Sequence, residues 1–538
     1  MLLLLWNKNS KEENYTINFK LGGKSSPEFS RPGYNIKIKG GNTLHGTKNF
    51  RLRSDQRDPT YMRTKLVTDI IQKSGLIAVE AGYTELYVND EYMGFWIMSD
   101  SVKSKWIERF FGPIEGEELT TLYQCKVDEI RFDDETAKSK CVNANDDHVD
   151  DMEEFHQFVD QVNAAKTRAD LEKIMDVDNF LKYMAWEYLV GSWDHFLGPF
   201  GHNIYWYKQP NGKWAYIPYD YDLDLGSCMW KDQFARKSYF EGEGDVQFPA
   251  VAFKDFELDH PIIKILVHDD DTRFRELLGD VVSKVFNPDT LLNRIDELKD
   301  FIEPYVKKQI ETGAGKINKL AKKQAAWTYD DFNENIEYTF LYDTKDHVKA
   351  FGLKDWVRRR YNTAAAYYGI DDKTHKLVEP RPEPKYFPYR EENNIVQVTD
   401  RVAHHHIGEP LPPYTPNKKY ADDTLPVLGV NEYNLERKNG GKANQETPAD
   451  DKCWSEAFGY KCCSKGCDAA VVEIDESGYW GAEKGDWCGI PANCYEKDEC
   501  PGKKYGYPCC EKCKVFLKDE SGAWGAEHGE WCSIKDSC

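Results

Sequence analysis

Apolar and polar residues alternate along three short stretches near the start of the chain, as in half-buried β-strands. These stretches cover residues 15–19, 34–38 and 50–53. A glycine- and serine-rich loop, GGKSS at 22–26, joins the first two. Such a loop can present backbone N–H groups to a phosphate, although taken alone it is more typical of an ordinary hairpin. We therefore expect an antiparallel sheet at this end of the chain.

The hydrophobic period becomes helical farther along. Residues 59–74 carry apolar side chains three and four positions apart, and Gly75 is placed to end that helix. A hairpin is predicted over 85–98, a short amphipathic helix over 103–111, and an acidic solvated loop over 132–151.

The middle of the chain is predominantly helical in pattern. We predict an irregular segment over 227–256 and helices over 151–164, 168–175, 178–190, 259–326 and 345–368. In the helix over 178–190, Asp178 is the expected N-cap and Gly191 the terminator. Strands early and helices late predict the α+β class for this domain.

Residues 192–226 concentrate candidate chemistry. Two aromatic strands, 203–208 and 213–218, flank a Pro-Asn-Gly turn, which is a strong hairpin signal. The polar loop before them carries Asp194, and three acids at a spacing of two follow them: Asp220, Asp222 and Asp224. Carboxylates two apart in a strand share a face, and their repulsion is relieved by a hard cation such as Mg²⁺ or Ca²⁺. This pattern predicts a metal site at the end of a hairpin.

Charge and composition exclude several functions. The chain of 538 residues has a formal net charge of -21, with acids spread along its length. That argues against nucleic-acid binding and against adhesion to an anionic membrane, since both need clustered Lys and Arg. An aromatic content of 14% is compatible with carbohydrate contact, although packing is its commoner cause. No apolar run approaches the ~20 residues of a membrane span.

Cysteines indicate the compartment. Twelve of the 15 lie between Cys453 and Cys538, and the other three are Cys125, Cys141 and Cys228. A dense, even-numbered set without paired CxxC units or a flanking His pair favours disulfides over a zinc site. We therefore expect a secreted protein. The first residues, MLLLLWNKNS, fall short of a signal-peptide core of about 7 to 15 apolar residues, so we expect the export signal to be missing from this sequence.

Proline and charge dominate residues 374–450, which we predict to be a semi-rigid linker with polyproline character. His404, His405 and His406 lie within it. Three adjacent histidines can hold a metal weakly, but an exposed loop is the more common explanation.

The chain ends in a repeat. Both copies contain GY-x-CC followed by DESG-x-WGAE-x-G-x-WC, over 453–494 and 500–538. Modules of about 40 residues bury little core, so we expect their disulfides to be required for folding. Six cysteines per module allow fifteen pairings. Trp480 and Trp524 follow the Asp-Glu-Ser-Gly turn and suit a binding face, whereas packing against disulfides is the rival explanation, especially for Trp487 and Trp531.

The repeats resemble tandem fungal dockerins, the disulfide modules of anaerobic-fungal cellulosome proteins, and are similar to the family-10 carbohydrate-binding module. The resemblance implies attachment to scaffoldin cohesins. By the same resemblance, the cohesin contacts are Tyr460, Asp475, Trp480, Tyr507, Asp519 and Trp524. The disulfide cysteines are Cys453, Cys462, Cys463, Cys467, Cys488, Cys494, Cys500, Cys509, Cys510, Cys513, Cys532 and Cys538.

Residues from about 15 to 370 resemble the CotH family, an atypical protein-kinase-like fold. The matching motifs are GGKSSPEFSRPGYNIKI, NFRLRSDQRDPTYMRTKL, LYVNDEYMGFWIMSD, GSWDHFLGPFGHNIYWY and IPYDYDLDLG. The resemblance implies binding of ATP with Mg²⁺ (Mn²⁺ as an alternative) and phosphoryl transfer to protein Ser or Thr, the chemistry that clustered acids around a metal support.

Residue by residue, the resemblance makes Asp194 the catalytic acid and Asn203 and Asp222 the metal ligands, with Asp220 as the alternative ligand and Asp224 as structural support. It places Lys37, Arg31 and Arg63 on phosphate, and Asp100 beside the lysine or the metal. Asp100 stands where the family usually has Glu, and Arg31 where it commonly has Lys, so the reach and the donor geometry both change.

The expected architecture has four parts: a kinase-like domain over 1–373, the linker over 374–450, and two small disulfide-rich β modules over 451–495 and 498–538. We expect a secreted cellulosome component whose first domain phosphorylates an extracellular protein. The alternatives are an inactive domain carried as cargo, and repeats that bind cellulose or another plant polysaccharide rather than a cohesin.

Overall fold

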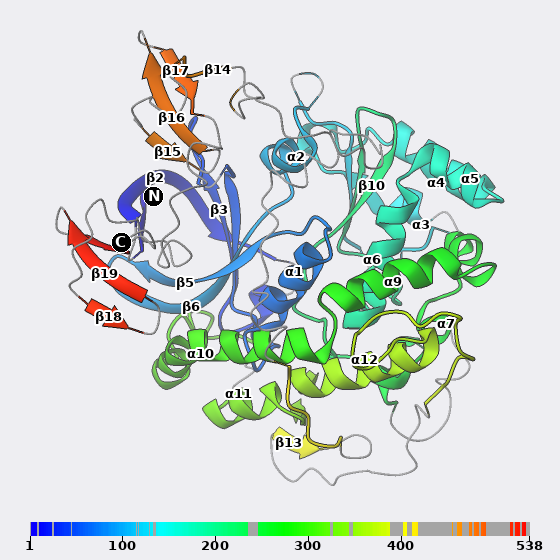
Figure 1. The fold of residues 1–538 in the computed structure, drawn as a ribbon. Coiled ribbons are helices and arrows are strands. Elements are labelled where there is room, and N and C mark those ends of the chain that lie inside the picture. The colour runs from blue at the N-terminus through cyan, green and yellow to red at the C-terminus, as the bar shows by residue number, and fades with distance from the viewer. Residues whose placement is uncertain are drawn as a thin grey trace. The chain divides into compact units, whose positions relative to one another are not determined.

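The computed structural model describes residues 2–7, 10–23, 26–44, 46–114, 116, 118–127, 130–132, 136–234, 246–322, 327–343, 348–387, 402–405, 411–417, 455, 460–464, 473–475, 478–483, 486–490, 517–519, 522–527 and 530–533. The chain divides into two compact units, Met1–Gly441 and Lys442–Cys538. The α+β class predicted for the first unit is confirmed, with strands gathered early and helices late (Figure 1).

An antiparallel sheet opens the first unit, in the strand order β1-β2-β3-β4-β6-β5. Its strands are β1 (Leu2–Asn7), β2 (Ser10–Leu21), β3 (Tyr34–Ile38), β4 (Asn49–Arg53), β5 (Ala81–Val88) and β6 (Glu91–Asp100). The alternation seen in the sequence sorts the side chains onto two faces. One face packs a small apolar core that includes Ile36, Leu52 and Trp96. The opposite face is polar and carries Lys20, Lys37, Arg51 and Arg53.

A second sheet has the strand order β10-β9-β7-β8 and is antiparallel. It consists of β7 (Leu122–Cys125), β8 (Cys141–Asn143), β9 (Ile204–Lys208) and β10 (Trp214–Pro218). A disulfide between Cys125 and Cys141 joins β7 to β8, a pairing that the sequence analysis did not predict. The strand β8 and helix α3 (Thr136–Lys140) lie where we expected only a loop.

Helices enclose the main core of this unit. They are α1 (Arg63–Lys73), α2 (Ser104–Phe111), α4 (Glu153–Ala164), α5 (Arg168–Ile174), α6 (Val177–Val190), α7 (Phe253–Phe256), α8 (Pro261–Ile263), α9 (Thr272–Lys284), α10 (Pro288–Thr312), α11 (Tyr329–Ile336) and α12 (Leu353–Tyr368). Almost every side chain of α6 is buried, and this helix contacts α9, α12 and β10 (Figure 1).

Several predicted boundaries move. The N-cap of α6 is Asp176, whose side chain accepts from the Asn179 N–H, rather than Asp178. The helix predicted over 345–368 begins only at Leu353, because β11 (Phe340–Asp343) and β12 (Val348–Phe351) precede it as a hairpin. The helical region predicted over 259–326 ends at Thr312, where Gly313 adopts the left-handed conformation and caps α10.

The described part of the predicted linker packs on the first unit. Strand β13 (Val402–His405) pairs with β11, so His404 and His405 belong to a sheet rather than to a loop. Tyr414 donates to the carboxylate of Asp289 over 2.7 Å. His406 and residues 418–450 lie outside the described residues. The proline pattern did not reveal these attachments, because an added strand and one tyrosine need no extended apolar pattern.

The second unit contains two small sheets, each built around an antiparallel meander of three strands. In the first copy β15 (Glu473–Asp475), β16 (Gly478–Glu483) and β17 (Asp486–Gly489) form a meander, and β14 (Lys461–Cys462) pairs parallel with β17. In the second copy β18 (Leu517–Asp519), β19 (Gly522–Glu527) and β20 (Glu530–Ser533) repeat the meander. The expected small β modules are thus confirmed in fold class.

Across these described parts of the chain, no helix is both long and apolar enough to span a lipid bilayer.

Candidate active site

Two cavities lie between the polar face of the first sheet and the loops that flank β9 and β10. Their volumes are about 720 and about 690 Å³. Both cavities are lined by the same six residues at their boundary: Asn35, Arg51, Arg53, Gln124, Tyr219 and Asp220. They therefore adjoin, and together they form one polar cleft at the sheet.

The first cavity collects the predicted catalytic and metal-binding residues, namely Asp194, Asn203, Asp220 and Asp222. The Asn203 side-chain amide donates to a carboxylate oxygen of Asp194 over 2.8 Å. This bond directs the amide nitrogen toward Asp194 and leaves the amide oxygen as the Asn203 atom suited to a metal. His202 also approaches Asp194, with 3.5 Å between Nε2 and the carboxylate. Asp224, in contrast, is buried and does not line either cavity.

A buried acid on α6, Glu187, holds the loop that carries Asp194. Helix α6 ends at Gly191, where φ is +66° and a Cβ would lie 2.3 Å from the Trp356 ring, so the turn requires glycine. Glu187, one turn earlier, accepts the Leu197 N–H over 2.8 Å and the Tyr216 hydroxyl. Burial raises the pKa of Glu187 to about 8, although both hydrogen bonds oppose that rise. The acid thus fixes the loop without lining the cleft.

His195 connects this loop to the segment that carries Asp220. Its Nε2–H donates to the Tyr219 carbonyl over 2.9 Å, and its Nδ1 pairs with the Ser192 hydroxyl. The Tyr219 N–H in turn donates to the Asn203 carbonyl over 2.9 Å. Burial lowers the pKa of His195 to about 4, so the ring is neutral at pH 7. These bonds hold the residues next to Asp194 and Asp220 in a fixed relation.

A basic side chain from the first sheet, Arg53, contacts the acids of the first cavity. Arg53 on β4 forms an ion pair with Asp220, and its other terminal nitrogen lies 3.7 Å from Asp222. Burial alone would raise the pKa of Asp220, but the guanidinium groups of Arg53 and Arg51 bring it well below its usual range. Burial, and next the charge of Asp220, raise the pKa of Asp222 to about 8.

Backbone strain coincides with the site. Asn203 and Asp220 have φ of +58° and +77°, in the left-handed region that non-glycine residues seldom occupy. Asp55, which lines the same cavity, has φ of +39°. Such conformations cost free energy and persist where the surrounding structure enforces them, often at functional sites.

Two predicted nucleotide-contact residues line the second cavity. Lys37 is exposed on the polar face of β3, and Asp100 is buried at the end of β6. Among the residues that the structure describes, Asp100 is paired with Arg109, at 3.8 Å, rather than with Lys37. Burial, and next the nearby charge of Glu80, raise the pKa of Asp100 to about 8. Lys37 and Asp100 thus share a cavity but form no pair.

The other two predicted phosphate contacts, Arg31 and Arg63, are absent from the lining of both cavities. Arg31 is buried, donates to the Phe95 carbonyl over 2.6 Å and stacks on Trp96. Arg63 is fully buried, pairs with Asp58 and donates to Asn335 over 3.1 Å. Both side chains are buried with partners away from the cleft, so the structure does not bring them to the acids.

Arg51 and Arg53, which we did not predict as site residues, line both cavities. Both lie on β4, two residues apart, and therefore on one face of the sheet. The alternation in Asn49-Phe-Arg-Leu-Arg53 contained that signal, because apolar residues toward the core put the arginines on the opposite face. Asp55 was missed as well: its carboxylate accepts the Thr64 hydroxyl over 2.8 Å, and burial raises its pKa to about 6.

The donor set suits a hard divalent cation. Asn203, Asp220 and Asp222 offer only oxygen atoms, the ligand type that Mg²⁺ prefers. One oxygen of Asp220 is buried and has no hydrogen-bond partner within the described parts of the chain. Such an atom is costly to bury unless something binds it. A cation at this point would bridge and neutralise phosphate oxygens.

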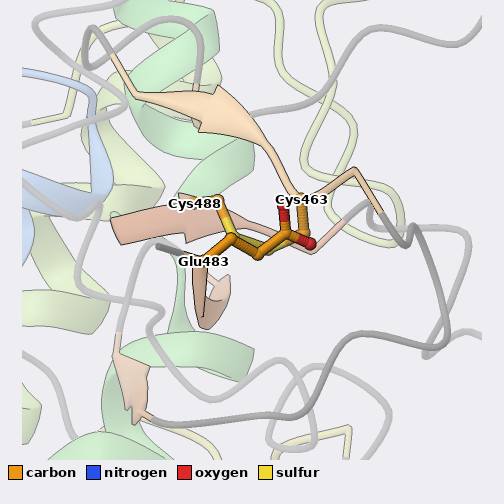
Figure 2. Close-up of side chains that lie close together, drawn as sticks. All are labelled: Cys463, Glu483 and Cys488. Carbon is orange, nitrogen blue, oxygen red and sulfur yellow. A yellow bond between two sulfur atoms is a disulfide. The ribbon is translucent and has the colours of Figure 1, made fainter. Parts of the chain in front are cut away.

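In the second unit, Figure 2 shows Cys463 and Cys488 joined by a disulfide with Glu483 beside them. Glu483 accepts the Ser464 hydroxyl over 2.6 Å. Because both sulfur atoms belong to the disulfide, they cannot act as thiolate ligands, and this cluster is a crosslink rather than a zinc site. Cys462 forms no disulfide with any residue that the structure describes.

The predicted cohesin contacts are described only in part. Tyr460 is 45% exposed at the start of the first module. Asp475 and Trp480 lie on β15 and β16, and Asp519 and Trp524 on β18 and β19, but their side chains lie outside the described residues, as does all of Tyr507. Trp487 is 42% exposed, which differs from the packing that we considered for it. Of the other module cysteines, Cys532 is described only as part of β20 and the remainder are not described.

The parts of the cleft follow one another as they do in protein kinases. A glycine-containing loop lies between two strands, basic residues follow on β4, and a loop Asp, an Asn and further acids come later in that order. The first unit is therefore a kinase-like α+β domain. The family model described as "CotH kinase protein" matches residues 19–362, so the chain belongs to the CotH family. A second model, "Cellulose or protein binding domain", matches residues 452–490 and 499–534.

Several individual proteins are similar to parts of this chain. Invasin CotH3 of Rhizopus delemar is 23% identical over 391 residues, covering 68% of this chain and 63% of that protein. Endoglucanase B of Neocallimastix patriciarum is 45% identical over 62 residues, covering 11% of this chain and 12% of that protein. The structure "Double dockerin from Piromyces equi Cel45A" is 38% identical, with a TM-score of 0.09, covering 16% of this chain and 88% of that one. The chain spans less than two thirds of the length of the invasins it matches.

Proposed function

We propose that the first unit is a protein kinase that uses ATP with Mg²⁺, or Mn²⁺, to phosphorylate Ser or Thr of an extracellular protein. The observation that carries the proposal is the convergence of Asp194, Asn203, Asp220 and Asp222 on one cavity, opposite the arginines of β4. In this proposal Asp194 orients the acceptor hydroxyl and accepts its proton. Asn203 and Asp222, with Asp220, hold the metal, which neutralises charge on the phosphates.

The sheet supplies the positive half of the proposed site. Arg51, Arg53 and Lys37 share the polar face of β3 and β4 and line the adjoining cavities. Planar guanidinium groups bind phosphate oxygens in pairs, which makes two arginines on one strand a suitable phosphate clamp. Gly22 and Gly23 line the first cavity and provide the backbone approach that a phosphate needs.

The test is transfer of label from γ-³²P-ATP by the full-length chain with Mg²⁺, with the chain itself and a Ser/Thr-rich protein as acceptors. We expect Asp194→Asn and Asp222→Ala to lose at least about 100-fold of the rate, since the first removes the acid that accepts the hydroxyl proton and the second removes a ligand of the metal. Asp147→Asn, on the exposed surface, is the matched control and should keep the rate. Equal transfer by Asp222→Ala and the unaltered chain would refute the mechanism and leave the unit as inactive cargo.

For the second unit we propose docking to the cohesin of a scaffoldin, so that the chain is a secreted component of an anaerobic-fungal cellulosome. The match of both repeats to a cellulose- or protein-binding family supports it, as does the exposure of Tyr460. The disulfides in both units favour an oxidising, extracellular setting. Retention of the full-length chain on immobilised scaffoldin but not on cellulose is expected. The reverse result would make the repeats polysaccharide-binding modules.

A further inference from the structure

Arg53 lies where a metal would be expected to lie. Its guanidinium group pairs with Asp220 through one terminal nitrogen and approaches Asp222 through the other, at 3.7 Å. We propose that Arg53 is the resident cation of this acid pair: it occupies the metal position in the nucleotide-free protein and must leave it when a divalent cation binds. This inference rests on the proposed function for its metal site, but it concerns the protein before any nucleotide is bound.

The acids need such a cation. Asp55, Asp220 and Asp222 all line the first cavity, and each has only limited access to water. Carboxylates gathered in this way repel one another, and their partial burial weakens screening by water. The guanidinium of Arg53 pairs with Asp220 and lies 3.7 Å from Asp222, so its positive charge offsets the repulsion between these two acids.

Arg53 and a divalent cation compete for the same two acids. The guanidinium is hydrogen-bonded to one oxygen of Asp220 and lies 3.7 Å from one oxygen of Asp222, while the other Asp220 oxygen has no hydrogen-bond partner within the described residues. A divalent cation held by these acids would lie close to the guanidinium, and because like charges repel, its binding favours movement of the arginine away from them. Because Arg53 is on the face of β4 that lines both cavities, a displaced guanidinium stays beside Arg51. Its charge then becomes available to the phosphates.

Arg51 provides the matched control. It lies on the same face of the same strand and lines both cavities. Within the described residues it makes no ion pair with Asp220 or Asp222, whereas Arg53 contacts both. Removing either arginine deletes one positive charge from the cleft, but only removal of Arg53 vacates the metal position.

The experiment measures Mn²⁺ binding to the full-length chain without nucleotide, by isothermal titration calorimetry and by water-proton relaxation. We expect Arg53→Ala to bind Mn²⁺ about 10-fold more tightly than the unaltered chain, since an internal competitor is gone. Arg51→Ala should change the affinity less than about threefold, because among the described residues Arg53, and not Arg51, is paired with these acids. Affinity for a non-hydrolysable ATP analogue with Mn²⁺ should move the opposite way and fall about 10-fold in Arg53→Ala, since a phosphate contact is lost.

Arg53→Lys guards against a variant that fails to fold. The lysine keeps the charge but cannot bridge two carboxylates, so its Mn²⁺ affinity should lie between those of the unaltered chain and Arg53→Ala. Equal or weaker Mn²⁺ binding by folded Arg53→Ala, or an equal gain in Arg51→Ala, would overturn the inference while leaving the kinase proposal intact. Absence of Mn²⁺ binding in the unaltered chain, Arg53→Ala and Arg51→Ala alike would remove the metal site on which both proposals rest.

Discussion

His195 offers a test of how the catalytic loop is held. The ring is buried and neutral, with its pKa lowered to about 4 by burial. An unfolded chain releases the ring to an ordinary pKa of about 6.5. Folding is therefore favoured by the neutral ring above pH 6.5, and this contribution is lost as the pH falls from 6.5 toward 4. Between pH 7.5 and pH 4.5, the linkage amounts to about 2.5 kcal/mol of unfolding free energy.

The perturbation is His195→Gln, which removes the titration and retains a side-chain N–H able to reach the Tyr219 carbonyl. The assay is urea unfolding of the full-length chain at several pH values, followed by tryptophan fluorescence. Acids such as Glu187 also titrate, but they are common to both proteins and cancel in the difference. We expect the unaltered chain to lose about 2.5 kcal/mol more than the variant between pH 7.5 and 4.5. Exposed His148→Gln is the control, and equal pH slopes in His195→Gln and the unaltered chain would refute this account.

Three further predictions concern other parts of the molecule. Glu187 has a folded pKa of about 8, so its contribution is present at low pH and is lost as the pH rises from about 4.5 to 8. Between pH 5 and 8.5 the unaltered chain should therefore lose about 4 kcal/mol more unfolding free energy than Glu187→Gln in the same urea assay. Equal pH dependence of the two proteins would contradict the conclusion that burial raises this pKa. Replacing Cys125 and Cys141 by Ser should lower the free energy of unfolding by about 3 kcal/mol, because the disulfide closes a loop across a sequence separation of 16. Calorimetry of the variant and of the unaltered chain, with and without reductant, measures this loss. Identical unfolding midpoints would contradict the prediction. Tyr460→Ala should weaken scaffoldin binding about 10-fold, measured by biolayer interferometry, without affecting label transfer. Tyr87 in the first unit has a similar exposed fraction, so Tyr87→Ala is the control and should leave scaffoldin binding unchanged.

Local patterns predicted the elements of this chain well where period and terminators agreed. Alternation placed β3 and β4 correctly, and the Pro-Asn-Gly turn placed the β9–β10 hairpin. The predictions failed where short elements depend on distant partners. Strand β13 exists through its pairing with β11, some sixty residues earlier, and β8 through its pairing with β7. A four-residue strand in a polar stretch carries too little local signal for such pairing to be inferred.

In the candidate site, too, residues close together in sequence were predicted correctly, whereas those that depend on distant elements were not. Asp194, Asn203 and the acids after β10 lie close together in sequence, so one hairpin suffices to gather them, and they do line one cavity. The cations that line the cleft come from the other sheet, and identifying them requires the register of β3 and β4. Resemblance favoured Arg31 and Arg63, but these side chains point into the interior, where Arg31 contacts Phe95 and Arg63 contacts Asp58 and Asn335. Sequence alone does not show that a charged residue has its partners in the interior.

The register of β4 determines which of its residues can face the cleft. Because alternation fixes which face a residue occupies, Arg51 and Arg53 can reach the acids only while Phe50 and Leu52 remain in the core on the other side. A one-residue slip of β4 would bury both arginines and expose both apolar side chains, at a cost of several kcal/mol. The charge that faces Asp220 and Asp222 is therefore protected by the packing of the small core behind it. At positions 51 and 53 one basic residue can therefore be replaced by another. A basic residue at the neighbouring positions 50 or 52 would face the core instead of the acids.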